Sequence, residues 1–162
     1  MLPRARVRLD GVPVALFLAA EQHQNDLLRE IALMAVATTG HESGHRYADL
    51  LAAADRYAHR PAAIRRRIAD TVAVGERAGW DTVTVDVEAD EAIAEAALAW
   101  EDLLRRFDRM SRDEQLLTLP ADAELAAFRH WYVREVVEQV RTGRAPVSWH
   151  DARVDALAGA AG

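Results

Sequence analysis

The fold is decided by the stretch VPVALFLAAEQHQNDLLREIALMAVAT, residues Val12–Thr38, in which a short extended segment runs directly into a long helical one. Pro13 and the β-branched valines beside it favour extended backbone, so we expect the change from strand to helix near residues 18–20. Apolar side chains then recur every three or four residues, as on one face of an α-helix. This face carries Leu16, Ala20, His23, Leu27, Ile31 and Met34. The stretch therefore predicts a strand over 12–18 and a helix that ends near Thr38.

A second strand-to-helix unit begins at Thr82. The segment TVTVDVE, residues 82–88, alternates valine with polar residues, which is typical of a strand with one buried face. A helix over Glu91–Met110 is expected to follow at once. Its apolar stripe consists of Ile93, Ala97, Trp100, Leu104 and Phe107. The two units share little sequence identity, so we interpret them as similar structural arrangements and not as a proven sequence repeat.

The remaining segments predict three more helices. These are expected at Tyr47–His59, Pro61–Arg77 and Asp122–Thr142. The second of them carries three arginines, residues 65–67, on its predicted outer face. Asp10-Gly11 is a good turn signal, so residues 4–9 are expected to form a hairpin with 12–18, or else a frayed terminus before a single strand.

These segments predict a mainly α (α+β) fold with about five helices packed on a small two- or three-stranded antiparallel ribbon. The chain has 162 residues, 51% hydrophobic and 28% charged, which suits one globular domain with a substantial core. We expect this domain to span residues 1–150 and residues 151–162 to form a flexible C-terminal tail of small side chains. No segment reads as a signal peptide or membrane span, so we expect a cytoplasmic protein without membrane contacts.

Composition excludes several kinds of chemistry. The chain has no cysteine, which excludes disulfides, thiol catalysis and thiolate metal sites. All 20 basic residues are arginine, which excludes lysine Schiff bases and the lysine of a phosphate-binding loop. The net charge of −6 disfavours nucleic acid as the main partner.

One short motif is typical of an enzyme. HESGH, residues 41–45, matches H-E-x-x-H, in which His41 and His45 would hold Zn²⁺ and Glu42 would activate a bound water. Candidates for the third ligand are His59, Asp70 and Glu76. Gly40 and Gly44 lower the helix propensity of this segment, and no further ligand motif follows it. We therefore interpret 41–45 as a polar loop without a metal and keep a small zinc hydrolase as the alternative.

An aromatic segment, FRHWY over residues 128–132, is the candidate for an interaction surface. Helical spacing places Phe128 and Tyr132 inside the protein and leaves Trp131 off the apolar stripe. An exposed tryptophan beside an arginine is typical of interface anchors, although the C-terminal tail could instead cover Trp131. The predicted surface consists of Trp131, Arg134 and Glu138.

A small-ligand pocket is a further possibility. His23 lies on the apolar face of the first helix, where we interpret it as a core histidine with a satisfied hydrogen bond. A pocket between the ribbon and the helices would lie near His23 and Trp100. Such a pocket would make the protein a small-ligand sensor.

Three segments together have a familiar pattern. They are GVPVALFLAAEQHQNDLLREIALM, VTVDVEADEAIAEAALAWEDLL, and LLTLPADAELAAFRHWYVREVVEQV followed by APVSW. The chain resembles a group of small, mainly helical proteins from GC-rich Gram-positive bacteria, often encoded near ATP-binding anti-sigma regulators and their antagonists. The resemblance implies a bacterial signalling context and no assigned chemistry, so it identifies no catalytic residue.

The leading prediction is a non-enzymatic regulatory or protein-interaction domain that needs no cofactor. Its partner would be another protein or a second copy of the chain, reached through a helical surface. The zinc hydrolase and the small-ligand sensor are the alternatives.

Overall fold

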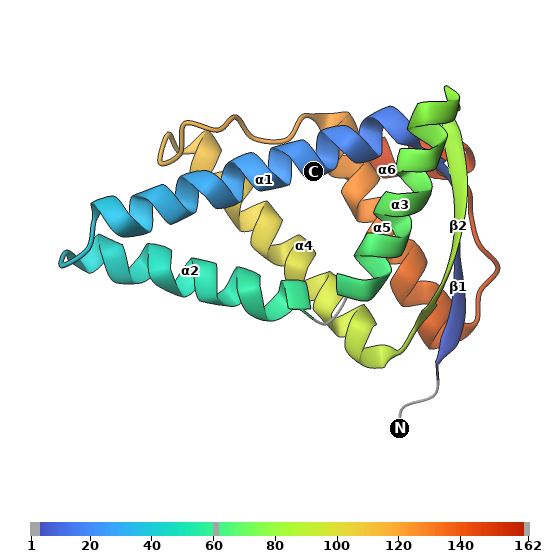
Figure 1. Cartoon of the computed structure of the whole chain (residues 1–162), viewed down its shortest axis with the longest axis horizontal. Helices are drawn as coiled ribbons and strands as arrows, with labels where there is room; N and C mark the ends of the chain where they lie inside the picture. The colour runs from blue at the N-terminus through green and yellow to red at the C-terminus, as the bar shows by residue number, and fades with distance from the viewer. Residues whose placement is uncertain (1–3, 60–61, 161–162) are drawn as a thin grey trace.

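The computed structural model describes residues 4–59 and 62–160, and this part of the chain is mainly helical (Figure 1). The elements are β1 (Ala5–Pro13), α1 (Val14–Ala37), α2 (Glu42–His59), α3 (Ala62–Ala78), β2 (Thr82–Ala89), α4 (Glu91–Arg112), α5 (Ala123–Thr142) and α6 (Trp149–Ala160). The predicted class, a mainly helical protein with a small antiparallel ribbon, is confirmed. Pro61, the predicted first residue of the third helix, lies outside the described residues.

The predicted number of about five helices is one short, because residues 149–160 form α6. Most of this segment, residues 151–160, is part of the predicted flexible tail. In the structure Trp149 is buried, and Ala152 and Leu157 of α6 pack against the apolar core beneath the ribbon. The helix lies against α5 and also touches β1.

The two strands pair antiparallel, and the Asp-Gly pair forms a bulge inside β1. Between the pairs Leu9–Val85 and Val12–Val83, β1 advances by three residues while β2 advances by two. Gly11 takes a left-handed φ of +67° at this irregularity. The extra residue keeps Leu9 and Val12 on the same buried face, as a β-bulge does. The predicted hairpin turn is therefore wrong, because the chain continues straight through it.

Helix α1 begins at Val14, well before the predicted boundary at residues 18–20. Pro13 pairs with Thr82, the first residue of β2, so no partner strand lies opposite the residues that follow Pro13. The N–H of Val14 donates to the Asp81 carbonyl over 2.9 Å, and the chain is helical from this residue onward. The predicted strand over 14–18 is therefore wrong. β2 has no residue left to pair with these positions, and the β-preference of valine does not make up for the missing partner.

The free edge of β1 is covered by one side chain of α5. Gln139 Oε1 accepts the Arg8 N–H over 2.9 Å, and Gln139 Nε2 donates to the Arg8 carbonyl over 2.8 Å. These are the two bonds that a residue of a neighbouring strand would exchange with Arg8. The ribbon of the described residues has two strands, because residues 5–9, which were expected to supply the possible third strand, form the first part of β1.

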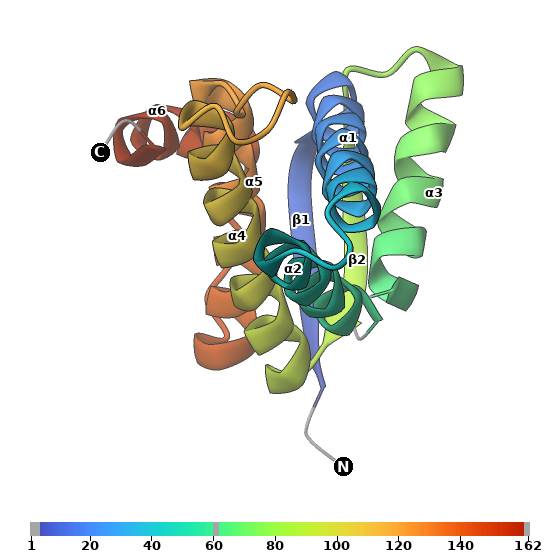
Figure 2. The same ribbon diagram turned by 90° about the vertical axis from the view of Figure 1, so that its left-hand side faces the viewer.

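The described residues form two large apolar clusters and a small third one, which joins α4 to α5 through Ala94, Val133 and Val137. Helix α5 packs on β1 and α3 packs on β2, so both cover the buried face of the ribbon (Figure 2). Helices α1 and α2 form an antiparallel hairpin that projects away from the ribbon (Figure 1). Phe128 lies in the cluster beneath the ribbon, and Phe107 lies in the cluster between α1, α2 and α4. None of the helices described has the length and hydrophobicity to cross a membrane.

Candidate functional site

The HESGH motif is the start of a helix, because α2 begins at Glu42. A Cβ atom at position 44 would lie 2.2 Å from the carbonyl oxygen of Thr38. Only glycine therefore lets the first turn of α2 approach the end of α1 this closely. The predicted loop over 41–45 is wrong from Glu42 onward, and only His41 precedes the helix.

The motif residues do not assemble a metal centre in the part of the chain whose side chains are described. His41, Glu42 and His45 are all exposed. Within that part, no three His, Asp or Glu side chains converge as a metal ion requires. Asp70 and Glu76 are exposed on α3, and the side chain of His59 lies outside the described residues. The geometry therefore gives the zinc-hydrolase alternative no support.

Trp131 is covered by the C-terminal segment. Its side chain is only 3% exposed, and its indole N–H donates to the Val147 carbonyl over 3.0 Å. The Trp149 ring lies against it, with 5.7 Å between the ring centroids. The interpretation of Trp131 as an exposed anchor is therefore wrong, and the alternative, burial under the tail, holds. Arg134 is exposed and Glu138 is half-buried on α5, and both remain predicted partner contacts.

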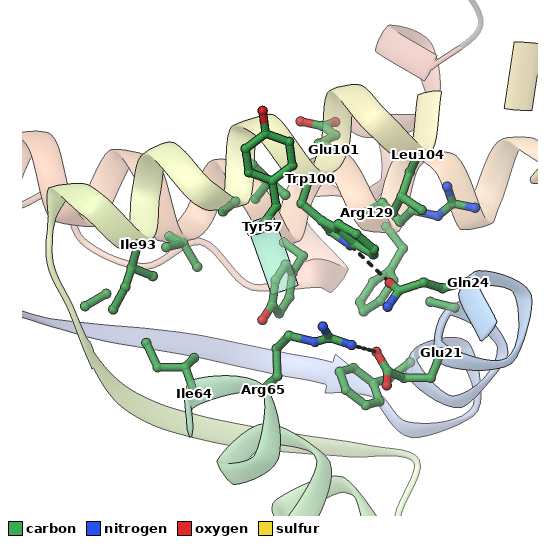
Figure 3. Close-up of a pocket in the computed structure, with 18 of the residues that line it drawn as sticks. Glu21, Gln24, Tyr57, Ile64, Arg65, Ile93, Trp100, Glu101, Leu104 and Arg129 are labelled. Carbon is green, nitrogen blue, oxygen red and sulfur yellow. Dashed lines mark hydrogen bonds and ion pairs between the residues drawn. The ribbon is translucent and has the colours of Figure 1, made fainter. Parts of the chain in front are cut away.

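A cavity of about 100 Å³ lies where β2 meets α1, α3, α4 and α5, and one residue of α2 also lines it (Figure 3). We call it the central cavity. Its apolar wall includes Phe17, Ile64, Val87, Ile93, Ala97, Leu104, Phe128 and Val136. Trp100 lines the cavity as predicted, whereas His23 does not. Protein cores rarely leave such a space, and an apolar pocket with few polar groups is the usual form of a small-molecule site.

Gln24 and Trp100 form the polar centre of this wall. The Trp100 indole N–H donates to Gln24 Oε1 over 3.1 Å, which joins α4 to α1 (Figure 3). Gln24 is 7% exposed, and its Nε2 atom is buried without a hydrogen-bond partner among the described residues. An unpaired buried N–H group costs free energy, so Gln24 offers a donor that a ligand atom can accept.

Arg65 and Glu21 lie at a more exposed part of the cavity. Arg65 Nη2 is 4.0 Å from Glu21 Oε1, and both side chains are about one-third exposed. The Arg65 guanidinium also stacks over the Trp100 ring, 5.8 Å from its centroid. An arginine that contacts one carboxylate and one aromatic face gives the apolar cavity a polar border. The prediction that Arg65 lies on an outer face is therefore only partly right.

His23 and Arg129 form a hydrogen-bonded chain beside the cavity. Arg129 donates to His23 Nδ1 over 2.8 Å and to Asp108 Oδ2 over 3.2 Å. Because arginine can only donate, His23 Nδ1 accepts and its Nε2–H donates to the Leu119 carbonyl over 2.7 Å. Burial lowers the pKa of Arg129, and Asp108 opposes this effect. The prediction of a hydrogen-bonded His23 is confirmed, although the ring is half-buried.

Tyr132 and Glu101 are further polar residues of the lining, to which Tyr57 of α2 also belongs. Burial raises the pKa of Tyr132, so its hydroxyl stays protonated at neutral pH. Glu101 is buried and accepts from Arg105 over 2.8 Å, with His130 Nδ1 3.0 Å away. The carboxylates of the lining are thus engaged by cations, and the arrangement suits binding of an apolar molecule.

Sequence reasoning missed Gln24, the residue that gives the cavity its free donor. A glutamine beside the apolar stripe carries no motif, and only its burial and its bond to Trp100 reveal it. The chain matches no protein-family model, no curated protein and no solved structure. Its function therefore has to be inferred from the central cavity itself.

Proposed function

We propose that this protein is a non-enzymatic regulatory domain that senses a small molecule bound in the central cavity. The observation that carries the proposal is the cavity of about 100 Å³ with an apolar wall and an unpaired buried donor on Gln24. The Nε atom of Arg129, another residue of the lining, is also buried without a hydrogen-bond partner among the described residues. Burial of an apolar ligand there would recover dispersion contacts that the wall lacks and remove apolar ligand surface from water.

The position of the cavity suits a sensor, because its wall draws on both halves of the chain. Residues of α1 and α3 form one side, and residues of α4 and α5 form the other. A ligand that contacts all four helices would stabilise one spacing between them over another. In this proposal a partner protein or a second copy binds the side of α5 that carries Arg134 and Glu138, and its affinity depends on the spacing of the helices. Bacterial signalling, the context implied by the resemblance, is where we place this role.

The proposal is tested by asking whether the cavity holds a small molecule. Protein isolated from its native cells is denatured, and released small molecules are identified by mass spectrometry. Binding of toluene to the emptied protein is measured by calorimetry as an independent probe. We expect a bound metabolite, toluene binding, or both, and loss of each in Ala20→Leu, because Ala20 lines the cavity.

The matched control is Ala19→Leu, which makes the same change at the exposed neighbouring position of α1. It should leave binding within about twofold of the wild type, because position 19 lies outside the lining. Absence of both a metabolite and toluene binding would overturn the proposal. Equal binding by Ala20→Leu and the wild type would do so as well.

A further inference from the structure

We infer that the ligand of the central cavity is an uncharged, largely apolar molecule whose carbonyl or similar acceptor oxygen binds the Gln24 side-chain N–H. This inference rests on the proposed function and specifies the chemistry of the molecule. Three observations support it: the fixed orientation of the Gln24 amide, the pairing of the charges around the cavity, and the apolar wall opposite.

The orientation of the Gln24 amide is determined by Trp100. An indole N–H can only donate, so the Gln24 atom 3.1 Å from it must be the oxygen. The amide nitrogen is then directed away from Trp100, as Figure 3 shows, and it has no partner among the described residues. The cavity consequently presents a donor whose identity cannot be exchanged by an amide flip. A ligand atom that meets it has to be an acceptor.

The charges around the cavity disfavour a charged ligand. Arg65 faces Glu21, and Arg129 faces Asp108 over 3.2 Å. Glu101 has a cation of its own, Arg105 at 2.8 Å. An ionised ligand would lose its hydration on entry without gaining a free counter-charge, and this loss is large in an apolar site. A neutral acceptor oxygen needs only the Gln24 N–H.

Three compounds of similar shape separate the possibilities: methyl benzoate is neutral and has a carbonyl, benzoate is an anion, and cumene has no acceptor. Binding is measured by calorimetry and by the NMR signal of the Trp100 indole N–H, which is assigned by its loss in Trp100→Phe. We expect methyl benzoate to bind about tenfold more tightly than cumene, the value of one neutral hydrogen bond. Benzoate should bind more weakly than methyl benzoate.

Gln24→Met is made together with Trp100→Phe, because methionine alone would leave the Trp100 indole N–H as a new unpaired donor on the same wall. Compared with Trp100→Phe alone, the double variant should lose the preference for methyl benzoate over cumene and keep cumene binding within about threefold. Gln22→Met is the matched control, because Gln22 is exposed one half-turn away and bonds only Asp26. The control should keep the wild-type preference.

The outcomes distinguish this inference from the proposed function. If cumene binds as well as methyl benzoate, if benzoate binds best, or if the double variant keeps the preference, the inference is wrong and the cavity still binds small molecules. If none of the three compounds binds or shifts the Trp100 signal, the inference is also wrong, and the proposed function fails with it when neither a bound metabolite nor toluene binding is found.

Discussion

The carboxylate of Glu30 accepts the backbone N–H of Thr118 over 2.7 Å, and this contact holds the segment between α4 and α5 against α1. The neighbouring N–H of Leu117 donates to the same carboxylate. Burial acts to raise the pKa of Glu30, but these hydrogen bonds outweigh it and hold that pKa below its usual value. The carboxylate is therefore favoured in its ionised form in the folded protein.

A depressed pKa makes stability depend on pH. The contribution of Glu30 is present above the pKa of an unfolded glutamate and is lost as the pH falls through the lower folded value. We expect Glu30→Gln to lower the free energy of unfolding by about 1 kcal/mol at neutral pH, a value that takes the partial exposure of Glu30 into account. In acid, where the carboxylate is protonated, the substitution should leave the free energy of unfolding unchanged. Urea unfolding at both pH values measures the difference. Glu76→Gln, an exposed carboxylate on α3, should show no such effect.

Gly44 provides a test of whether HESGH is a structural motif. An alanine at this position would place its Cβ against the Thr38 carbonyl, so Gly44→Ala should destabilise the protein by about 1–3 kcal/mol through strain between α1 and α2. Chemical denaturation measures this loss. Ser43→Ala, at an exposed position of the same turn, should change stability by less than about 0.5 kcal/mol. Equal stabilities of the two variants would show that the close approach is dispensable.

Gln139 of α5 should be among the polar residues whose substitution destabilises the ribbon most. Gln139→Met leaves the N–H and carbonyl of Arg8 without their partners, at a cost of about 2–4 kcal/mol. Urea unfolding gives the total, and hydrogen exchange at the Arg8 amide reports the edge directly. Gln22→Met serves again as the exposed control. An unchanged exchange rate at Arg8 would contradict the assigned role.

Trp149 anchors α6, so its removal should release this helix. Trp149→Ala removes a buried ring that packs on Trp131 and Phe128, and a loss of about 3–5 kcal/mol is expected. Far-ultraviolet circular dichroism should report lost helix. With Trp80 and Trp100 replaced by phenylalanine, the emission left in Trp149→Ala is that of Trp131, and it should move to the red as water reaches the ring. His150→Ala, at the exposed neighbouring position, should leave both signals unchanged. An unchanged emission wavelength of Trp131 in Trp149→Ala would contradict the role of Trp149 in holding α6.

Local patterns predicted most of the helices and β2, because those elements carry their own signals. The alternation in residues 82–88 gives β2, and the α4 stripe from Ile93 to Phe107 gives the helix after it. Helix ends were predicted where a cap marks them: Asp122 accepts the Leu125 N–H at the start of α5, and Gly143 takes φ +67° at its end. Each of these features depends on neighbours in sequence.

The errors arose where a distant segment decides the conformation. An Asp-Gly pair suits either a hairpin turn or a bulge, and the position of β2 selects the bulge at Gly11. Glycine disfavours a helix in isolation, yet Gly44 is required because Thr38 lies so close. The cavity and the free donor of Gln24 depend on the spacing of four helices, which no local pattern records.

The amide of Gln139 has a consequence for how this protein behaves in a crowded solution. A two-stranded ribbon has two open sides, and an open side invites strands of other molecules to add to it. At Arg8 the side chain of α5 already occupies both positions at which an incoming strand would bond. One buried glutamine thus prevents an incoming strand from bonding to β1 at Arg8.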